Sequence, residues 1–436
     1  MSKFSLLHSG VKELQSRLLF VFIAIVVFRI GTHIPIPGVD LEQIGVIFAH
    51  GKTNSILGYF DMFTGGAMSK MSLLTLGIMP YVTASIVIQL LSYSLPKLQE
   101  LRKQGESGRQ IMNQYTRYLT VILSLVQGFT VTQLLVSKNL ILVPYWLFTY
   151  YSTITLCTGT MFLMWMGDQI TRYGVGNGTS LILFSGIVSR FPEAISRLVQ
   201  QAKLGQIHST KLVMVLALVI SVISFIVYME RGQRQLQLTY PKRQQLANRV
   251  NKNSSKLPLK INMVSVMPPI IAQTLILFPV SIGDFLAKAG VTNSIHLISM
   301  YLQPGEPLYM IAFVGMVVLF AFYMTAMMYS TDEIADQLKK GGALIGGIRP
   351  GKNTAEYIDK ILTKLTLFGG IYLAFVALLP DIVIRFLHVP LPFGGTSLLI
   401  SVVIVIEFMS QVQTYLLPGH VESVRGRSAN KLKLLH

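Results

Sequence analysis

The sequence predicts an all-α membrane protein whose chain crosses the bilayer ten times. Of its 436 residues, 52% are hydrophobic and only 13% are charged, whereas charged residues make up about 25% of a soluble domain. Apolar segments recur along the chain, and most are long enough for the roughly 20 residues that a transmembrane helix needs. Positive charge is confined largely to every second loop between these segments. These three observations exclude an ordinary soluble protein.

Ten segments fit the pattern of a transmembrane helix. They are, in chain order, residues 17–32, 71–93, 118–137, 146–167, 178–192, 211–229, 262–283, 307–329, 361–380 and 396–417. The first leads to Arg29 without a small-residue cleavage site, so we interpret it as a retained span and not as a signal peptide. The fourth contains Cys157, the only cysteine, so no disulfide can form within the chain.

The second span is unusually polar. It carries Gly77, Pro80, Thr83 and Gln89, and a helix of this kind is expected to face protein or a water-filled cavity and not lipid alone. Segments of this kind are typical of membrane proteins that let something cross. The sequence therefore predicts a membrane conduit.

The distribution of Lys and Arg predicts the orientation. Twenty-six of the 37 basic residues lie at the N-terminus, in the loops 94–117, 168–177, 230–261 and 330–360, or in the C-terminal tail. Because cytoplasmic loops collect Lys and Arg, both termini are expected to be cytoplasmic. The same rule accounts for the formal net charge of +18 without invoking nucleic acid.

Ten spans divide into two halves of five. We predict an N-terminal half over residues 1–192, a connection on the outer side over 193–210, and a C-terminal half over 211–436. An odd number of spans reverses the orientation of the second half. Two such halves, if alike, would be related by a pseudo-twofold axis in the membrane plane. No repeat is visible by direct residue matching, so the symmetry is inferred from topology.

One apolar stretch, residues 55–68, is not among the ten predicted spans. It is too short to span and contains Gly65 and Gly66. Segments of this length are often re-entrant or interfacial. The pattern does not distinguish a small element that folds back into a cavity from a simple interfacial loop.

No enzyme chemistry is visible in the sequence. The loop GVGNGTS (174–180) lacks the spacing and the preceding strand of a phosphate cradle, so a tight turn is expected there. Arg29 and Glu407 are the clear ionisable candidates within the spans, and they do not form a catalytic set. Neither a metal site nor a cofactor is predicted. The loops 230–261 and 330–360 each exceed 30 residues; they either set the topology or dock an acidic partner or RNA phosphates.

Particular strings of residues resemble the bacterial SecY family, in order and over nearly the whole chain. In the first half they are FRIGTHIPIPGVD (28–40), FTGGAMSKMSLLTLGIMPYVTASIVIQLL (63–91), GESGRQIMNQYTRY (105–118), GTMFLMWMGDQIT (159–171) and GNGTSLILFSGIV (176–188). In the second half they are RGQRQLQLTYPKRQQ (231–245), LPLKINMVSVMPPI (257–270), GIRPGKNTAEYIDK (347–360) and FGGTSLLISVVIVIEFMSQVQT (393–414).

The resemblance implies a protein-conducting channel with a central hourglass pore, closed by an apolar ring and by a short re-entrant plug helix at about residues 57–70. The implied ring consists of Ile78, Val82, Leu183, Ile270 and Ile400. Thr179 stands where the family has an aliphatic residue. The implied plug consists of Phe60, Asp61, Met62, Phe63, Thr64, Gly65, Gly66, Ala67 and Met68.

The resemblance also implies a lateral gate between the second and seventh spans, through which hydrophobic segments enter lipid. Its lining would include Thr83, Ile86, Gln89 and Phe278, and partners would dock at Lys242, Arg243 and Arg349. The implied partners are the SecE and SecG subunits, the SecA motor ATPase, the ribosome, polypeptides that carry a signal sequence, and membrane lipid. The implied location is the bacterial cytoplasmic (inner) membrane.

A secondary transporter of a small solute is the alternative function, because inverted repeats also serve transport. A transporter should show ion-coordinating groups in broken helices near the membrane midplane, and only Glu407 points that way. An intramembrane enzyme is a third class, and its catalytic residues are absent from the sequence.

Overall fold

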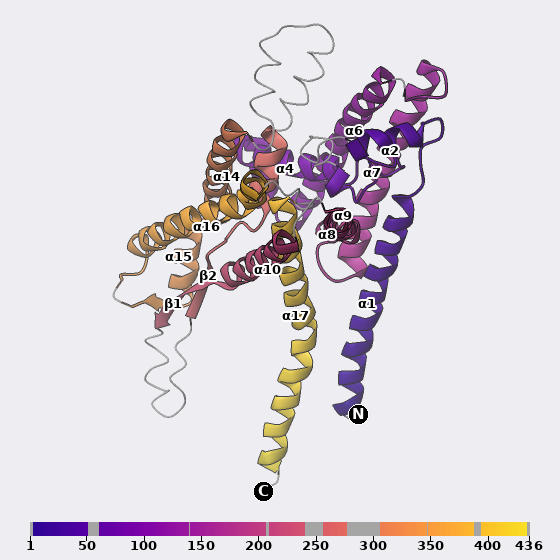
Figure 1. The fold of residues 1–436 in the computed structure, drawn as a ribbon. Helices are drawn as coiled ribbons and strands as arrows, with labels where there is room; N and C mark the ends of the chain where they lie inside the picture. The colour runs from indigo at the N-terminus through magenta and orange to yellow at the C-terminus, as the bar shows by residue number, and fades with distance from the viewer. Residues whose placement is uncertain are drawn as a thin grey trace. The chain divides into compact units, whose positions relative to one another are not determined.

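The structure, a computed structural model, describes residues 3–50, 61–138, 140–205, 209–239, 256–276, 306–346, 348–387 and 394–433 (Figure 1). The described chain is mainly helical. It separates into two compact units, which we call unit 1 (Met1–Val199 with Ile404–His436) and unit 2 (Gln200–Val403). The division of the chain into two inverted halves stays a prediction.

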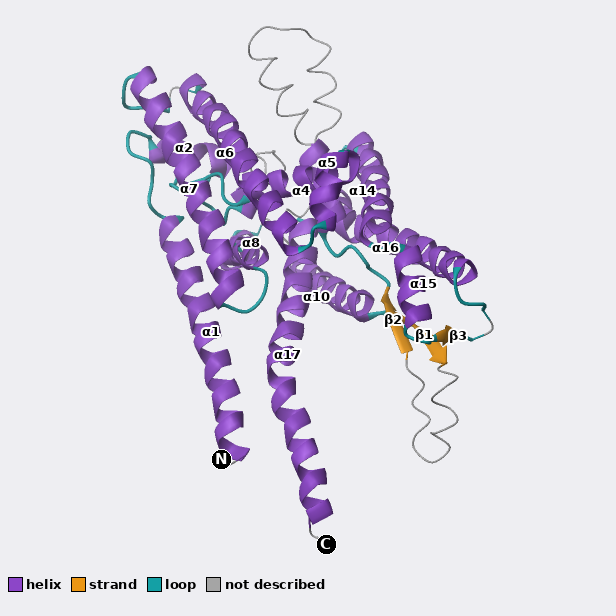
Figure 2. Ribbon diagram, turned by 180° about the vertical axis from the view of Figure 1, so that it is seen from behind, coloured by secondary structure: helices purple, strands orange, loops and turns teal. Residues whose placement is uncertain are grey.

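Unit 1 is built around two long helices that pack along each other, α6 and α7, as both ribbon views show (Figures 1 and 2). Its apolar core joins these helices to the chain that follows α1, with Phe148, Leu156 and Ile44 buried together. The first helices are α1 (Lys3–Gly31), α2 (Leu41–His50), α4 (Met79–Ser94) and α5 (Pro96–Lys103). The later ones are α6 (Glu106–Ser137), α7 (Tyr145–Tyr173), α8 (Gly178–Ser189), α9 (Phe191–Lys203) and, from Ile404, α17 (Gly395–Lys433).

Unit 2 has its own apolar core, in which Phe313, Val317, Val376 and Leu399 are buried. Four helices contribute residues to this core. The helices are α10 (Ser209–Arg231), a short apolar helix (Met267–Ile276), α14 (Pro307–Met328) and α16 (Lys352–Leu387), together with the first residues of α17.

The two long basic loops are not independent, because strands from both form one sheet. Strands β1 (Gln233–Thr239) and β2 (Lys256–Lys260) come from the first loop, and β3 (Leu344–Ile345) comes from the second. The order is β2-β1-β3 and both pairings are antiparallel. In Figure 2 the three strands lie together beside the end of α15 (Thr331–Lys340). The prediction of an all-α fold is therefore incomplete.

The sheet has a small core of its own. Leu236 and Leu238 of β1 are buried while the residues between and beside them are exposed, as the two-residue period of a strand requires. They pack against Ile358 and Leu362 of α16. Residues 330–360 thus contain a packed helix, a strand and the start of α16, and not one open loop.

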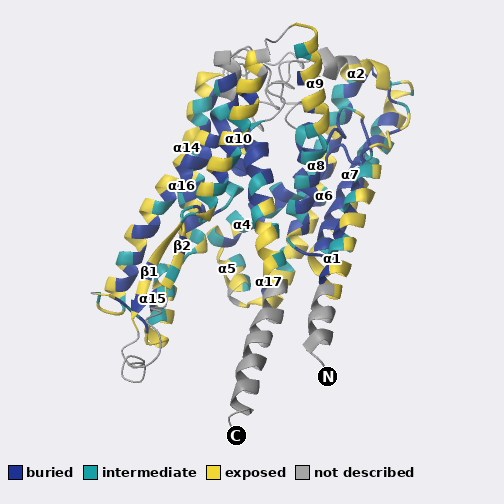
Figure 3. Cartoon of the chain, turned by 60° about the horizontal axis from the view of Figure 1, so that its bottom comes forward, coloured by how far each residue is buried: buried dark blue, intermediate teal, exposed yellow. Residues whose placement is uncertain are grey.

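Each of the ten predicted spans overlaps a helix of the described residues, and residues 277–283 of the seventh span lie outside them. Six described helices are long and apolar enough to cross a membrane by length and composition. The other four are α4, α7, α8 and the helix Met267–Ile276; α8 has 12 residues. Large apolar side chains are exposed along α1, α6, α7 and α14 (Figure 3), for example Phe22 and Trp146. Apolar surface of this extent suits contact with lipid, and the count of ten crossings stays a prediction.

The predicted span 71–93 is wrong at its beginning, because α4 starts eight residues later. Residues 71–78 form turns, and Gly77 has a φ of +58°, which no residue of a right-handed helix adopts. Pro80 lies in the first turn of α4, where its missing N–H costs nothing. The predicted connection 193–210 also differs, since α9 occupies much of it.

Candidate functional site

The segment of residues 61–70, which contains most of the predicted plug, is folded compactly and buried in unit 1. Phe63 and Ala67 are buried, the latter completely. Only residues 61–63 of this segment are helical, and turns follow. Gly65 and Gly66 end the helix, because their φ values of +71° and +83° lie in the left-handed region. Residues 57–60 of the expected short helix, including Phe60, lie outside the described residues, so the plug helix stays a prediction.

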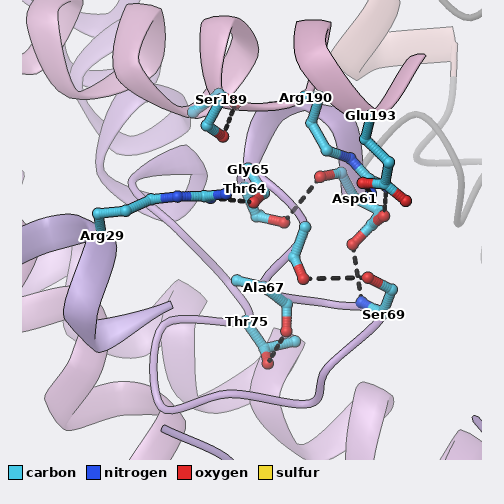
Figure 4. Close-up of polar contacts among 12 residues, drawn as sticks. Arg29, Asp61, Thr64, Gly65, Ala67, Ser69, Thr75, Ser189, Arg190 and Glu193 are labelled. Carbon is cyan, nitrogen blue, oxygen red and sulfur yellow. Dashed lines mark hydrogen bonds and ion pairs between the residues drawn. The ribbon is translucent and has the colours of Figure 1, made fainter. Parts of the chain in front are cut away.

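A buried ion pair holds this segment. Asp61 is only 1% exposed and its carboxylate pairs with the guanidinium of Arg190, at the end of α8 (Figure 4). The backbone N–H of Ser69 donates to the other carboxylate oxygen at 2.7 Å. Nη1 of Arg190 lies 3.0 Å from Oε2 of Glu193. A buried carboxylate is stable only when it is paired and hydrogen-bonded in this way.

Side chains from two further parts of unit 1 bind backbone carbonyls of the segment. Arg29 of α1 donates to the carbonyl of Gly65 at 2.9 Å, and Thr75 donates to that of Ala67 at 3.2 Å (Figure 4). Arg29, a charge inside the first predicted span, thus serves as a hydrogen-bond donor to the segment. Lys70 ends the segment on an exposed position, where desolvation and the charge of Arg29 lower the pKa of its amine.

The backbone of the segment touches the backbone of α8. A Cβ placed on Gly65 would lie 3.0 Å from the Cα of Gly186, and one placed on Gly186 would lie 2.6 Å from the carbonyl oxygen of Phe63. Glycine at both positions allows the close approach. A Cβ on Gly77 would meet the methyl carbon of Thr64 at 3.0 Å. The segment therefore packs between α8 and the turn that leads into α4.

The five predicted ring residues are buried, three of them in unit 1 and two in unit 2. In unit 1, Ile78 caps the N-terminus of α4, Val82 follows one turn later, and Leu183 lies in the middle of α8. Ile270 and Ile400 belong to unit 2, in the helix Met267–Ile276 and at the start of α17. A ring would join the two units and stays a prediction.

Thr179 lies at the start of α8. Its hydroxyl donates to Oδ1 of Asn177, the N-cap residue, at 2.5 Å, and its own N–H donates to the same oxygen at 3.1 Å. Its methyl carbon would be 3.5 Å from a Cβ on Gly167. Asn177 is the capping residue, and the Thr179 hydroxyl is satisfied by donating to its oxygen, so a threonine is accommodated there.

The predicted gate and docking residues are described only in part. Ile86 is buried in α4, and Thr83 and Gln89 are half-buried. Arg349 is exposed in the turn between β3 and α16, where its carbonyl accepts a hydrogen bond from Thr354 at 2.9 Å. Phe278, Lys242 and Arg243 lie outside the described residues. Both the gate and the docking surface stay predictions.

Arg190 is the residue that sequence reasoning missed. A single carboxylate, Asp61, in a short apolar segment signals that a cation must lie nearby. The chain has 37 Lys and Arg residues, and only the fold shows that the carboxylate pairs with Arg190 while Arg29 binds a carbonyl. Among the described residues, no group of His, Cys, Asp and Glu is placed to hold a metal ion.

Comparisons with known proteins agree with this architecture. The family model described as SecY matches residues 72–409. The protein translocase subunit SecY of Escherichia coli (strain K12) is 45% identical over 95% of this chain and 94% of its own, and that of Haemophilus influenzae is 46% identical over 95% of each. Two solved structures share the fold at 20% identity and 93% coverage of each chain. They are "The structure of a protein conducting channel", with a TM-score of 0.68, and Sec61 in the canine ribosome-channel complex, with 0.67. The chain therefore belongs to the SecY family and is a multi-pass membrane protein that forms a protein-conducting translocation channel, not an enzyme.

Proposed function

We propose that this channel passes unfolded secretory polypeptides across the bacterial cytoplasmic membrane, with both termini in the cytoplasm, and is sealed at rest by segment 61–70. The observation that carries the proposal is the position of the segment within unit 1. It packs against the turn at Gly77, immediately before Ile78 and one turn before Val82. A segment that lies beside two of the predicted ring residues is suited to closing the path that they line.

The apolar ring supplies the second part of the seal. A narrow throat lined by aliphatic side chains excludes water and ions by dewetting. Such side chains carry no charge or hydrogen-bonding group, so polypeptides of any sequence can slide past Ile78, Val82, Leu183, Ile270 and Ile400. Hydrophobic segments leave sideways into lipid through a gate between α4 and the seventh predicted span, lined by Thr83, Ile86, Gln89 and Phe278.

The small sheet of unit 2 is the proposed docking surface for the cytoplasmic partners. The canine Sec61 neighbour comes from a ribosome-channel complex, and a yeast Ssh1 complex of the same fold is bound to a ribosome. By analogy the ribosome and the SecA motor would dock here, at Arg349 and at Lys242 and Arg243, and SecE and SecG would complete the channel. Exposed basic residues on β1, β2 and α15 suit acidic protein surfaces or RNA phosphates.

Crosslinking to a stalled polypeptide tests the proposed path. A cysteine replaces Ile78 in a Cys157→Ser background, and the reconstituted channel receives a polypeptide with either a functional or a defective signal sequence. We expect crosslinks at position 78 with the functional signal only. A matched channel carries its cysteine at Trp146, which is 71% exposed on α7, and should give none. Equal yields at the two positions, or with both signals, would contradict the proposal and favour the alternative of a small-solute transporter.

A further inference from the structure

We propose that Arg190 is a bridge that holds segment 61–70 in its resting position and ties it to the start of α9. The inference rests on the proposed role of the segment as a seal. It assigns the resting position of the seal to one guanidinium, which binds Asp61 of the segment on one side and Glu193 of α9 on the other.

The first step concerns the charge of Asp61. Its carboxylate is almost completely buried, and among the described residues Arg190 is the cation that forms an ion pair with it. Removing one partner of a buried pair leaves an uncompensated charge and is strongly destabilising, whereas removing both charges together can be nearly neutral. While Asp61 is charged, loss of Arg190 therefore destabilises the buried position of the segment.

The second step concerns where Arg190 is attached. It is the C-cap residue of α8, and α9 begins at the next residue, Phe191. Its guanidinium also pairs with Glu193 in the first turn of α9 (Figure 4). The boundary between unit 1 and unit 2 falls inside α9, between residues 199 and 200. Any movement of α9 during opening would thus displace the guanidinium from Asp61 and release the segment.

The need to neutralise Asp61 predicts how the resting ion conductance of three variants should rank. Arg190→Gln leaves the carboxylate buried without its cation, so the ion conductance of the resting channel should rise by about 100-fold or more, as the loss of one partner of a buried pair implies. Asp61→Asn keeps an oxygen for the N–H of Ser69 and removes the charge, so the rise should stay below about 10-fold. The double variant should return to the level of Asp61→Asn alone.

Glu193→Gln tests the tie to α9. The pair with Arg190 is half-exposed on the glutamate side, and such a pair is weak. Resting conductance should match that of the parent, and opening by an added signal peptide should slow by about two- to fivefold. Opening at the parental rate would contradict the proposed role of the Arg190–Glu193 pair in coupling α9 to the segment.

The experiment measures ion flux through purified channel in liposomes, with and without signal peptide. A double variant that leaks as much as Arg190→Gln would overturn the bridge. A parental resting flux in Arg190→Gln would overturn it too, provided that a Gly-Ser linker of equal length in place of residues 61–70 leaks. If that linker channel is as tight as the parent, the proposed sealing function itself is wrong. Circular dichroism of each variant confirms that the helices are retained.

Discussion

Gly186 offers the sharpest test of the contact between α8 and segment 61–70. A methyl group added there should stabilise the helix and destabilise the buried position of the segment. Gly186 lies inside α8, where alanine is preferred over glycine by about 1 kcal/mol. The new Cβ would, however, lie 2.6 Å from the carbonyl oxygen of Phe63. Gly186→Ala should therefore stabilise the helix while it displaces the segment.

The size of the effect follows from the geometry. Contacts of a Cβ below 3.0 Å essentially never occur and comfortable ones begin near 3.4 Å, so the backbone at Phe63 must retreat by roughly 0.4 to 0.8 Å. Overpacking of a close contact costs about 1–3 kcal/mol. Converted at 1.36 kcal/mol per tenfold, the population of displaced segment should rise by about 5- to 150-fold. The shift would also lengthen the 2.9 Å hydrogen bond from Arg29 to the carbonyl of Gly65, two residues further along the chain.

The measurement is the ion conductance of resting channels in planar bilayers, together with the thermal unfolding temperature. Gly128→Ala is the matched control: Gly128 is a buried glycine inside α6 whose added Cβ would meet no atom closer than 3.5 Å. We expect a leak from Gly186→Ala, a tight channel from Gly128→Ala, and unfolding temperatures at or above the parental value for both. Equal resting conductance of the two variants would refute the idea that this backbone contact seats the segment.

Three further predictions concern the ring, the gate and the docking surface. Replacing Ile78, Val82 and Ile400 together with serine should hydrate the throat and raise resting ion conductance; a parental value in single-channel recordings would count against the ring. Gln89→Leu should tighten the closed gate by roughly 25 cal/mol per Å² of apolar area buried, so export of proteins with weak signal sequences should fall more than export with strongly hydrophobic ones. Equal losses in a pulse-chase assay would argue against a gating role. Arg349→Lys should lower motor-driven export while membrane insertion is retained, because lysine lacks the planar fork that binds a carboxylate or phosphate with two hydrogen bonds; export at the parental rate would leave Arg349 as a topology signal only.

The sequence was a good guide to what depends on local composition. Long apolar runs predicted the positions of the helices because burial in lipid requires them. The start of α4 was missed because apolar residues 71–78 continue the hydrophobic run, although Gly77 adopts a backbone conformation outside the helical region.

Contacts between distant parts of the chain could not be predicted in this way. The partner of Asp61 lies more than 120 residues away at Arg190, and nothing in the sequence singles out this arginine among the 37 Lys and Arg residues. The sheet was missed for the same reason. Leu238 pairs with Ile345, and neither strand shows from its own sequence which distant strand it will meet.

The sheet of unit 2 also sets an order of events during biosynthesis. The hairpin β1–β2 can form as soon as residue 260 has been made, but β3 follows about 100 residues after β1, beyond the seventh and eighth predicted spans. At about 5–20 residues per second, the third strand emerges some 5–20 s later. The surface proposed to receive the ribosome and motor would therefore be completed only after most of the membrane helices of the same chain have been synthesised. A nascent channel would be unable to recruit its own partners early, which delays its activity until the helices that must hold the membrane seal are in place.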